Sequence, residues 1–374
     1  MRILLVAPIH QENEFLKQKK NEIGMFGRMV NPFPISQGQN SWYQALVKLG
    51  CQVEVFYYTQ SLLIPNRLRI FLIDFFQRFL GLWYSRFLRA RSRFYFLSPE
   101  NYLRNLCLIL KAFKFKPDLF IISGGTTVIF PKTIFFLKKK LNCKVFLFNG
   151  MNPLLYSTLT ERKMIPFFDG ICTNNRCFAQ GWEKLGIKKA ISLPISSVEP
   201  KIYHKMNLSF DERKKYESDV CFVGSLTNER QQILGKLLDF NLKVWGEILP
   251  GHSLIPSLKK VYMGKAFGEK MAKIYNATKI ALNFHPKDMK FGGNMRTFEI
   301  CGCGAFQLID EVDQEWFKIG KEIVKYTNVN DLKKKINYFL KNGNEREKIA
   351  EAGRLRAIKD HTYEKHFKKF LSKI

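Results

Sequence analysis

Short apolar strands alternate with helical segments along most of this 374-residue chain, and this alternation is the feature that most restricts its fold. In the first half, strands are expected at residues 3–8, 53–58, 118–123, 144–148, 170–173 and 190–194. In the second half they are expected at residues 219–223, 242–245, 261–263, 280–284, 305–309 and 323–326. Strands that alternate with helices at this spacing form parallel, doubly wound sheets. The sequence therefore predicts an α/β protein.

The domain organisation follows from a polar, charged stretch at residues 199–218, which contains no expected strand and is placed as the linker. This gives an N-terminal domain over residues 1–205 and a C-terminal domain over 206–374, both Rossmann-like. The last helix, near residues 364–373, is expected to pack back on the first domain. Two such domains facing one another form a cleft, the usual place for a small-molecule site.

The composition excludes several classes of protein. No window approaches the ~20 apolar residues that a membrane-spanning helix needs, and the first residues lack a signal peptide's long core and cleavage site. A cytoplasmic location is therefore expected. The eight cysteines are scattered, and the pair Cys301 and Cys303 has no second pair at zinc-site spacing. We expect no bound metal and no cofactor.

The formal net charge of +29 points to an acidic partner, which is a nucleic acid, an anionic membrane or an acidic ligand. No zinc finger, helix-turn-helix or RNA-binding strand motif is present, which argues against nucleic acid. The basic residues are also concentrated in one segment. We therefore favour an anionic membrane surface, with peripheral attachment at the inner face of the cell membrane.

That segment is a basic and aromatic insertion at about residues 61–117, with eleven Lys or Arg and two acidic residues. At helical spacing, five arginines fall within an arc of about 100° on a largely apolar wheel: Arg67, Arg78, Arg86, Arg89 and Arg93. A basic amphipathic helix of this kind lies at anionic bilayer surfaces. The alternative is an ordinary helix pair packed on the sheet, with its arginines in water.

The most informative local sequence is residues 292–310, which follows an expected strand. It predicts a glycine turn, a short helix, a Gly-x-Gly stop and another buried strand. The free N–H groups at the helix start suit a phosphate, and Arg296 adds a cation in the first turn. Glu299, one turn later, can accept hydrogen bonds from a cis-diol such as a ribose. A diphosphate and a ribose together describe a nucleotide.

This segment resembles the donor-binding core of GT-B glycosyltransferases, in particular the CgeB-like group. Three other stretches match the pattern: residues 220–225 with Arg230, residues 279–285, and residues 349–354 with 361–363. The resemblance covers about residues 215–370. It implies the GT-B fold and a nucleotide-diphosphate sugar as donor. Many retaining members carry two glutamates eight positions apart. Glu299 resembles the second, but Phe291 stands at the place of the first, so the usual retaining assignment does not carry over.

Further candidates for donor binding follow from the matching stretches. Gly224 and Ser225 end a strand and begin a loop, where backbone N–H groups approach phosphates. Each candidate also has a structural interpretation, such as a tight turn, a solvated side chain or a structural histidine. The complete set is Gly224, Ser225, Arg230, Asn283, His285, Lys290, Gly293, Asn294, Arg296 and Glu299.

Glycosyl transfer also needs groups that handle charge and protons. No DxD motif is present to hold a divalent metal, so helix starts and cations are expected to stabilise the leaving nucleotide. An inverting reaction needs a base on the acceptor hydroxyl, and His10 or Glu12, after the first strand, would point into the cleft. Residues 38–41 resemble the glycine loop that faces the donor in this fold, or serve as a helix N-cap.

The expected function is transfer of a sugar to an acceptor held by the N-terminal domain. The acceptor is a glycan, a lipid-linked molecule or a protein, associated with the cell envelope or elsewhere. Two alternatives remain: a protein that binds sugar nucleotides without transferring the sugar, and a protein that binds nucleic acid or another polyanion.

Overall fold

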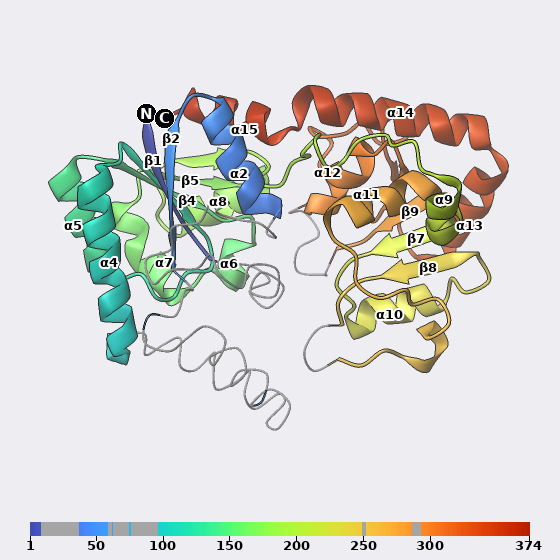
Figure 1. Cartoon of the computed structure of the whole chain (residues 1–374), viewed down its shortest axis with the longest axis horizontal. Helices are drawn as coiled ribbons and strands as arrows, with labels where there is room; N and C mark the ends of the chain where they lie inside the picture. The colour runs from blue at the N-terminus through green and yellow to red at the C-terminus, as the bar shows by residue number, and fades with distance from the viewer. Residues whose placement is uncertain (9–36, 59–61, 63–74, 76–95, 249–251, 286–292) are drawn as a thin grey trace. The chain divides into compact units, whose positions relative to one another are not determined.

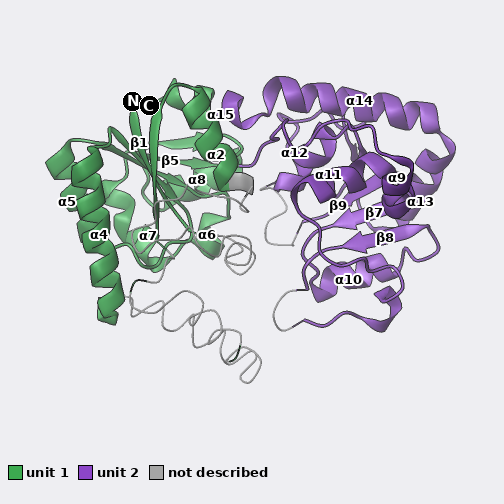
Figure 2. Ribbon diagram, viewed as in Figure 1, with its two compact units in different colours: residues 1–195, 367–374 green, residues 196–366 purple. Residues whose placement is uncertain are grey.

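The computed structural model describes residues 1–8, 37–58, 62, 75, 96–248, 252–285 and 293–374. These residues form two compact units, each with its own sheet (Figure 2). Unit 1 contains residues 1–195 together with 367–374, and unit 2 contains residues 196–366. The chain thus enters unit 2 after Ile195, whereas the sequence suggested a boundary after residue 205.

Unit 1 is built on a parallel sheet (Figure 1). Among the described residues it has six strands, in the order β2-β1-β3-β4-β5-β6. The strands are β1 (Arg2–Ala7), β2 (Gln52–Tyr57), β3 (Leu119–Ser123), β4 (Lys144–Phe148), β5 (Gly170–Thr173) and β6 (Ala190–Ser192). Every residue of β3 is buried, as expected for a parallel strand that is covered on both faces. The apolar runs in the sequence therefore mark the strands of the sheet.

Helices connect these strands, and local sequence sets their ends. They are α2 (Gln37–Lys48), α4 (Pro99–Phe115), α5 (Pro131–Leu141), α6 (Pro153–Tyr156), α7 (Leu159–Met164) and α8 (Arg176–Lys184), with a 3₁₀ turn at Ile165–Phe167. Proline, whose ring presets the helical φ, opens α4 and α5. Both helices end at a residue in the left-handed conformation, Lys116 or Asn142. Helix α4, which lies within the expected insertion, connects β2 to β3.

The C-terminal residues complete the core of unit 1. Helix α15 (Tyr363–Leu371) carries Phe367 and Phe370, both buried. The ring of Phe367 stacks on Phe148 at a centroid distance of 5.7 Å, and the ring of Phe370 contacts Phe146 at 5.2 Å. Trp42 of α2 lies against the same cluster, 6.1 Å from Phe367. Unit 1 is therefore assembled from both ends of the chain.

Unit 2 has five parallel strands in the order β11-β10-β9-β7-β8 among the described residues. They are β7 (Ser218–Val223), β8 (Leu242–Trp245), β9 (Thr278–Asn283), β10 (Phe306–Ile309) and β11 (Val324–Lys325). The expected strand at residues 261–263 was wrong: Tyr262 makes only an isolated bridge to Val244. A single bridge beside the edge strand β8 does not extend the sheet.

The helices of unit 2 are α9 (Phe210–Tyr216), α10 (Asn228–Gly235), α11 (Gly268–Ala277), α12 (Met295–Gly302), α13 (Val329–Lys341) and α14 (Gly343–Asp360), with a 3₁₀ turn at Pro256–Leu258. Helix α9 lies inside the stretch that the sequence suggested as a linker, and a capping box of Ser209 and Glu212 opens it. Separate apolar clusters form the core of the unit. Within the described ranges, no helix has the length and apolar character needed to cross a membrane.

Unit 2 contains a chain of buried hydrogen bonds that includes residues near its first and last positions. The His361 Nε2 atom contacts the Trp316 carbonyl at 2.8 Å, and its Nδ1 faces the His366 Nε2 atom at 3.3 Å. The His366 Nδ1 atom meets the Ser197 hydroxyl at 2.6 Å. Because a carbonyl can only accept, His361 donates from Nε2, and in its neutral form it accepts at Nδ1. This arrangement suits neutral imidazoles.

The pH dependence of stability tests this arrangement. Burial lowers the pKa of His361 below its usual value of 6.5. The unfolded chain therefore binds a proton more readily, and stability should fall as the pH drops below about 6.5. We expect the melting temperature of a His361→Gln variant to decline less than that of the wild type between pH 7.5 and pH 5. His204 is exposed, so His204→Gln should keep the wild-type profile. Identical profiles for all three proteins would contradict the assignment.

Candidate functional site

The candidate site lies at the carboxyl edge of the unit 2 sheet. In the order β11-β10-β9-β7-β8, β8 lies on one side of β7 and β9 to β11 lie on the other. The order in which strands are added to the sheet therefore reverses between β7 and β9. Ligands of doubly wound sheets bind where the strand order reverses, beyond the carboxyl ends of the strands. Gly224 and Ser225 follow β7, His285 follows β9, and α12 begins at Met295. The reversal therefore gathers most of the donor-site residues that the sequence indicated.

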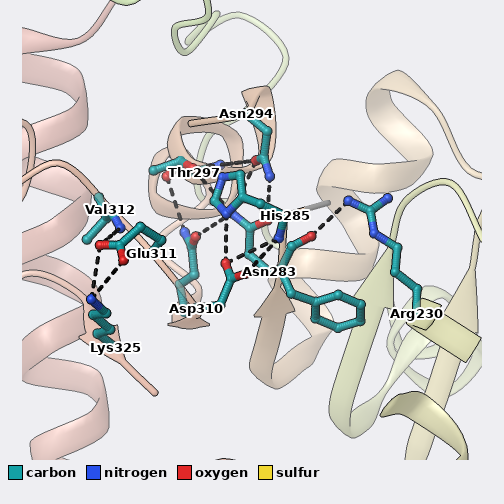
Figure 3. A network of polar contacts seen from close by, with 11 residues as sticks. Arg230, Asn283, His285, Asn294, Thr297, Asp310, Glu311, Val312 and Lys325 are labelled. Carbon is teal, nitrogen blue, oxygen red and sulfur yellow. Dashed lines mark hydrogen bonds and ion pairs between the residues drawn. The ribbon is translucent and has the colours of Figure 1, made fainter. Parts of the chain in front are cut away.

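The start of α12 is fixed to the ends of two strands by a network of side-chain amides (Figure 3). Asn294, the N-cap residue, accepts a hydrogen bond from the Thr297 amide and donates one to the Asn283 Oδ1 atom at 2.8 Å. The Asn283 Nδ2 group donates to Gln307 on β10 at 2.8 Å and also contacts Asn294 and Thr297. The amides of Asn283 and Asn294 are therefore engaged within the protein and position the helix.

That network leaves the first turn of α12 open. The backbone N–H groups of Met295 and Arg296 precede the first intrahelical hydrogen bonds, and neither has a partner within the residues that the structure describes. The helix has eight residues and no acidic side chain in its first turn. The start of α12 therefore combines free N–H donors with the partial positive charge of a helix end.

Arg296 and Glu299 form an ion pair one turn apart on α12. The Glu299 side chain is 1% exposed and the Arg296 side chain 25% exposed. Arg296 also donates from Nε to the Val223 carbonyl at 3.1 Å. Burial disfavours the guanidinium charge, but Glu299 more than offsets it and raises the pKa of Arg296. The pair joins α12 to the end of β7, with the carboxylate on its buried side.

Tyrosines surround the buried carboxylate. Burial, reinforced by Glu299, raises the pKa of Tyr203, and burial is also the first cause of the raised pKa of Tyr275. Both tyrosines are therefore neutral hydroxyl groups at physiological pH. Arg296 is the cation that balances Glu299 in this environment.

Arg230 joins the two loops on either side of the strand reversal. Its guanidinium donates to the Ser225 carbonyl at 2.9 Å and to the Phe284 carbonyl at 2.8 Å. Its charged carbon lies 5.8 Å from the ring centres of both Phe222 and Phe284, at the distance of a cation–π contact. Its Nε atom is buried without a partner among the described residues. Arg230 thus places a fixed positive charge at the strand ends.

His285 is held in a defined orientation by Asp310, which follows β10 (Figure 3). The His285 Nδ1 atom lies 2.7 Å from Oδ1 of Asp310, and the His285 backbone N–H donates to the same carboxylate. A carboxylate acceptor at Nδ1 places a proton on that nitrogen. The opposite nitrogen, Nε2, is buried and has no partner in the described part of the chain.

Three glycines are required by close packing at this edge. A Cβ on Gly246, at φ +157°, would lie 1.7 Å from the Gly224 carbonyl oxygen. Gly293 has φ +63°, and a Cβ there would lie 2.2 Å from the Trp316 ring. A Cβ on Gly224 itself would lie 2.9 Å from the Phe222 ring. The sequence assigned Gly224 and Gly293 to donor binding, and the structure gives a steric reason for glycine at both positions.

The sequence did not assign Asp310, Gln307 or Tyr326 to this site. Asp310 directly follows a buried strand, which was a usable signal, but its acidic neighbours made it resemble a simple loop. Tyr326 lies beside Asp310 and Arg230, and burial raises its pKa. Its hydroxyl has no partner within the described ranges. The positions of these residues relative to the site depend on the order of the strands in the sheet, which cannot be read from a single sequence.

Several expected site residues lie outside the described residues. These are His10, Glu12, Lys290 and the five arginines Arg67, Arg78, Arg86, Arg89 and Arg93. Residues 38–41 form part of α2, which begins at Gln37. No group of three or more histidine, cysteine, aspartate or glutamate side chains in the described part could hold a metal ion.

Comparisons with known proteins agree with this architecture. Residues 228–372 match the family model described as "Glycosyl transferase-like". The chain is 25% identical over 273 residues to spore protein CgeB of Bacillus subtilis, an alignment that covers 68% of this chain and 82% of the relative.

Solved structures resemble the whole chain in fold. Sucrose-phosphate synthase from Thermosynechococcus elongatus gives a TM-score of 0.62 at 12% identity, with 100% of both chains covered. The Anabaena protein HepE, in complex with UDP-glucose, gives 0.61 at 11% identity, again with 100% of both chains covered.

The two parallel sheets and the likeness to these solved structures show the GT-B fold. The family model and the sequence similarity to CgeB support a CgeB-like glycosyltransferase with that fold.

The Gly293 turn provides a test of how tightly the start of α12 is positioned. In Gly293→Ala, a left-handed alanine and a clash with Trp316 should together lower the free energy of unfolding by about 2–4 kcal/mol. Gly320 also has positive φ, but no atom lies within 4 Å of a Cβ there. Gly320→Ala should therefore lose only about 1 kcal/mol. Urea unfolding measures both values, and equal losses would refute the close packing.

Proposed function

We propose that this glycosyltransferase moves a sugar from a nucleotide-diphosphate sugar to an acceptor held by unit 1. The observation that carries the proposal is the convergence, at the strand reversal of unit 2, of an open helix start and two cationic side chains. The Anabaena protein HepE, which shares the fold, was solved with UDP-glucose. That complex supports a donor of the same chemical class for this chain.

In this proposal the nucleotide diphosphate lies at the start of α12. The backbone N–H groups of Met295 and Arg296, together with the loop at Gly224 and Ser225, bind the phosphates. Glu299 accepts hydrogen bonds from the ribose hydroxyls. Since its carboxylate is 1% exposed, the ribose must reach it through a displacement of the neighbouring side chains. Arg296 is the side chain that we propose moves, because a phosphate can take the place of Glu299 as the anionic partner of Arg296.

Catalysis requires stabilisation of the charge that develops on the leaving diphosphate. Arg230 supplies a fixed cation at the strand ends, Arg296 supplies a second once it has moved from Glu299 to the phosphate, and Lys290 is proposed to add a third. His285 donates or accepts at Nε2, in the orientation that its contact with Asp310 sets. We propose that these groups make a divalent metal unnecessary.

The acceptor and the base are assigned to unit 1. His10 or Glu12 is proposed to take the proton from the acceptor hydroxyl in an inverting reaction, with residues 38–41 facing the donor. The acceptor is proposed to be an envelope-associated glycan, a lipid-linked molecule or a protein. The arginines at positions 67, 78, 86, 89 and 93 are proposed to hold the enzyme at the inner face of the cell membrane.

Phe291 favours a second candidate, a protein that binds the sugar nucleotide without transferring the sugar. It occupies the place at which many retaining relatives carry a glutamate. Slow hydrolysis of the donor in the absence of an acceptor would distinguish the two, since a protein that only binds should leave the donor intact.

Nucleotide binding at Glu299 is tested with a thermal-shift screen of UDP, GDP, dTDP and CMP, followed by calorimetry with the nucleotide that stabilises most. In Glu299→Gln, loss of a charge-assisted hydrogen bond should weaken nucleotide binding about tenfold or more. Glu351 makes a similar ion pair with Arg354 three residues further along α14, so Glu351→Gln is a matched control. Unchanged affinity in Glu299→Gln would remove this residue from the site.

Glu299→Gln also leaves Arg296 without its partner, which should destabilise the fold by about 3 kcal/mol or more. Binding is therefore measured well below the melting temperature of each variant. Loss of affinity in a variant that remains folded by circular dichroism is the supporting result.

Metal independence is tested by dialysis against EDTA. Because arginine and lysine side chains and a helix start are proposed to stabilise the leaving group, donor turnover should persist at its original rate. Loss of turnover that Mn²⁺ or Mg²⁺ restores would refute this part of the proposal.

A further inference from the structure

Helix α4 of unit 1 has its apolar and polar faces reversed. Its buried side carries Asn101, Arg104 and Asn105 beside Leu108 and Ala112. Its exposed side carries large apolar residues at helical spacing: Leu103, Leu106, Leu110 and Phe113, with exposed fractions of 41%, 50%, 61% and 40%. Residues spaced in this way form one continuous stripe along a helix. A soluble helix ordinarily places such a stripe against the core.

Specific contacts of the polar side chains hold this orientation. The Asn105 amide donates to the Val128 carbonyl at 2.9 Å and accepts from the Phe130 N–H at 2.8 Å. Arg104 pairs with Glu100 at 3.2 Å. Asn105 therefore binds the loop that leads into α5, and turning the apolar side of the helix inward would leave this buried amide unsatisfied. The stripe is therefore held outward by the fold of unit 1.

Helix α5 extends the apolar surface. It lies beside α4 in Figure 1, and the rings of Phe113 and Phe136 are 6.0 Å apart. Phe135 and Phe136 are exposed at 49% and 38%. We call this surface the α4–α5 apolar face, defined by Leu103, Leu106, Leu110, Phe113, Phe135 and Phe136.

The charges around the α4–α5 apolar face are positive. Exposed lysines on or next to the two helices make no ion pair with a described residue: Lys114, Lys116, Lys132, Lys139 and Lys140. The neighbouring acidic groups are neutralised, Glu54 by Lys111 and Asp118 by Arg2. An apolar stripe with unpaired lysines is the chemistry of a surface that contacts anionic lipids.

The same charges argue against a second copy of the chain as the occupant. In a twofold dimer the same patch meets itself, so the unpaired lysines of both copies would come together. The net charge of +29 would add to this repulsion. An anionic bilayer, in contrast, offers negative headgroups to the lysines and acyl chains to the leucines.

We propose that the α4–α5 apolar face docks on an anionic lipid bilayer. Leu106, Leu110 and Phe113 enter the headgroup boundary, and the lysines contact phosphate groups. The proposal deepens the membrane location proposed for the enzyme by assigning it to described side chains. It rests on no step of sugar transfer, because vesicle binding is measured without donor or acceptor.

The test is sedimentation of the full-length protein with vesicles of phosphatidylglycerol and phosphatidylcholine, compared with phosphatidylcholine alone. The wild type should bind the anionic vesicles selectively, and Leu110→Glu should reduce that binding about tenfold or more. The matched control is Leu355→Glu on α14, where the leucine is 56% exposed. It makes the same change in charge and should bind within about twofold of the wild type.

Two further measurements cover the other possible occupants. Sedimentation velocity follows the oligomeric state: a dimer that Leu110→Glu dissociates would overturn the proposal in favour of a second copy. If another part of the chain covers the stripe, Leu110→Glu should lower the melting temperature far more than Leu355→Glu, with anionic binding unchanged. That result would also overturn it.

A milder variant keeps the test possible if Leu110→Glu fails to fold. Leu110→Gln removes the apolar contact without adding charge, so it should also weaken binding to anionic vesicles. If both Leu110 variants bound anionic vesicles as strongly as the wild type, or if the wild type did not bind them, the proposal would be refuted even if donor turnover were normal.

Discussion

The candidate site depends on one set of contacts, the amide network that ties the start of α12 to the ends of β9 and β10. Asn283 and Asn294 exchange hydrogen bonds, and Gln307 contacts Asn283 from the neighbouring strand. A helix start binds an anion well only if it is held still, since reorganisation weakens every contact. The same network fixes the helical turn that carries Arg296 and Glu299, and it therefore also positions these two charged residues.

Much of this architecture is predictable from the sequence, because the buried parallel strands are largely apolar and several of them end at, or are followed by, glycine or asparagine. Residues 119–123 and 280–283 are examples. The role of Asn283 was not predictable. In sequence it is a polar residue at a strand end, as suitable for a ligand as for an internal contact. Only the order of β7, β9 and β10 brings Asn294 and Gln307 to it. The pairing of His285 with Asp310 was missed for the same reason, because it joins residues 25 positions apart.

Helix α4 illustrates a different limit of prediction from sequence. Its pattern of leucines indicates an amphipathic helix, and the usual inference places the apolar face inward. The structure places Asn101, Arg104 and Asn105 inward instead, because they hydrogen-bond or pair within unit 1. Periodicity establishes that a helix has two faces, but the satisfaction of buried polar groups decides which face the core receives.

The packing of α15 has a consequence for the order in which the protein forms on the ribosome. Phe367 and Phe370 complete the aromatic cluster of Phe146, Phe148 and Trp42, yet they are translated only after the whole of unit 2. Unit 2 lies wholly between the two parts of unit 1 and has all its residues available earlier. The unit whose synthesis begins first is therefore the last to close its core, and a nascent chain carries that unfinished surface until α15 has been translated.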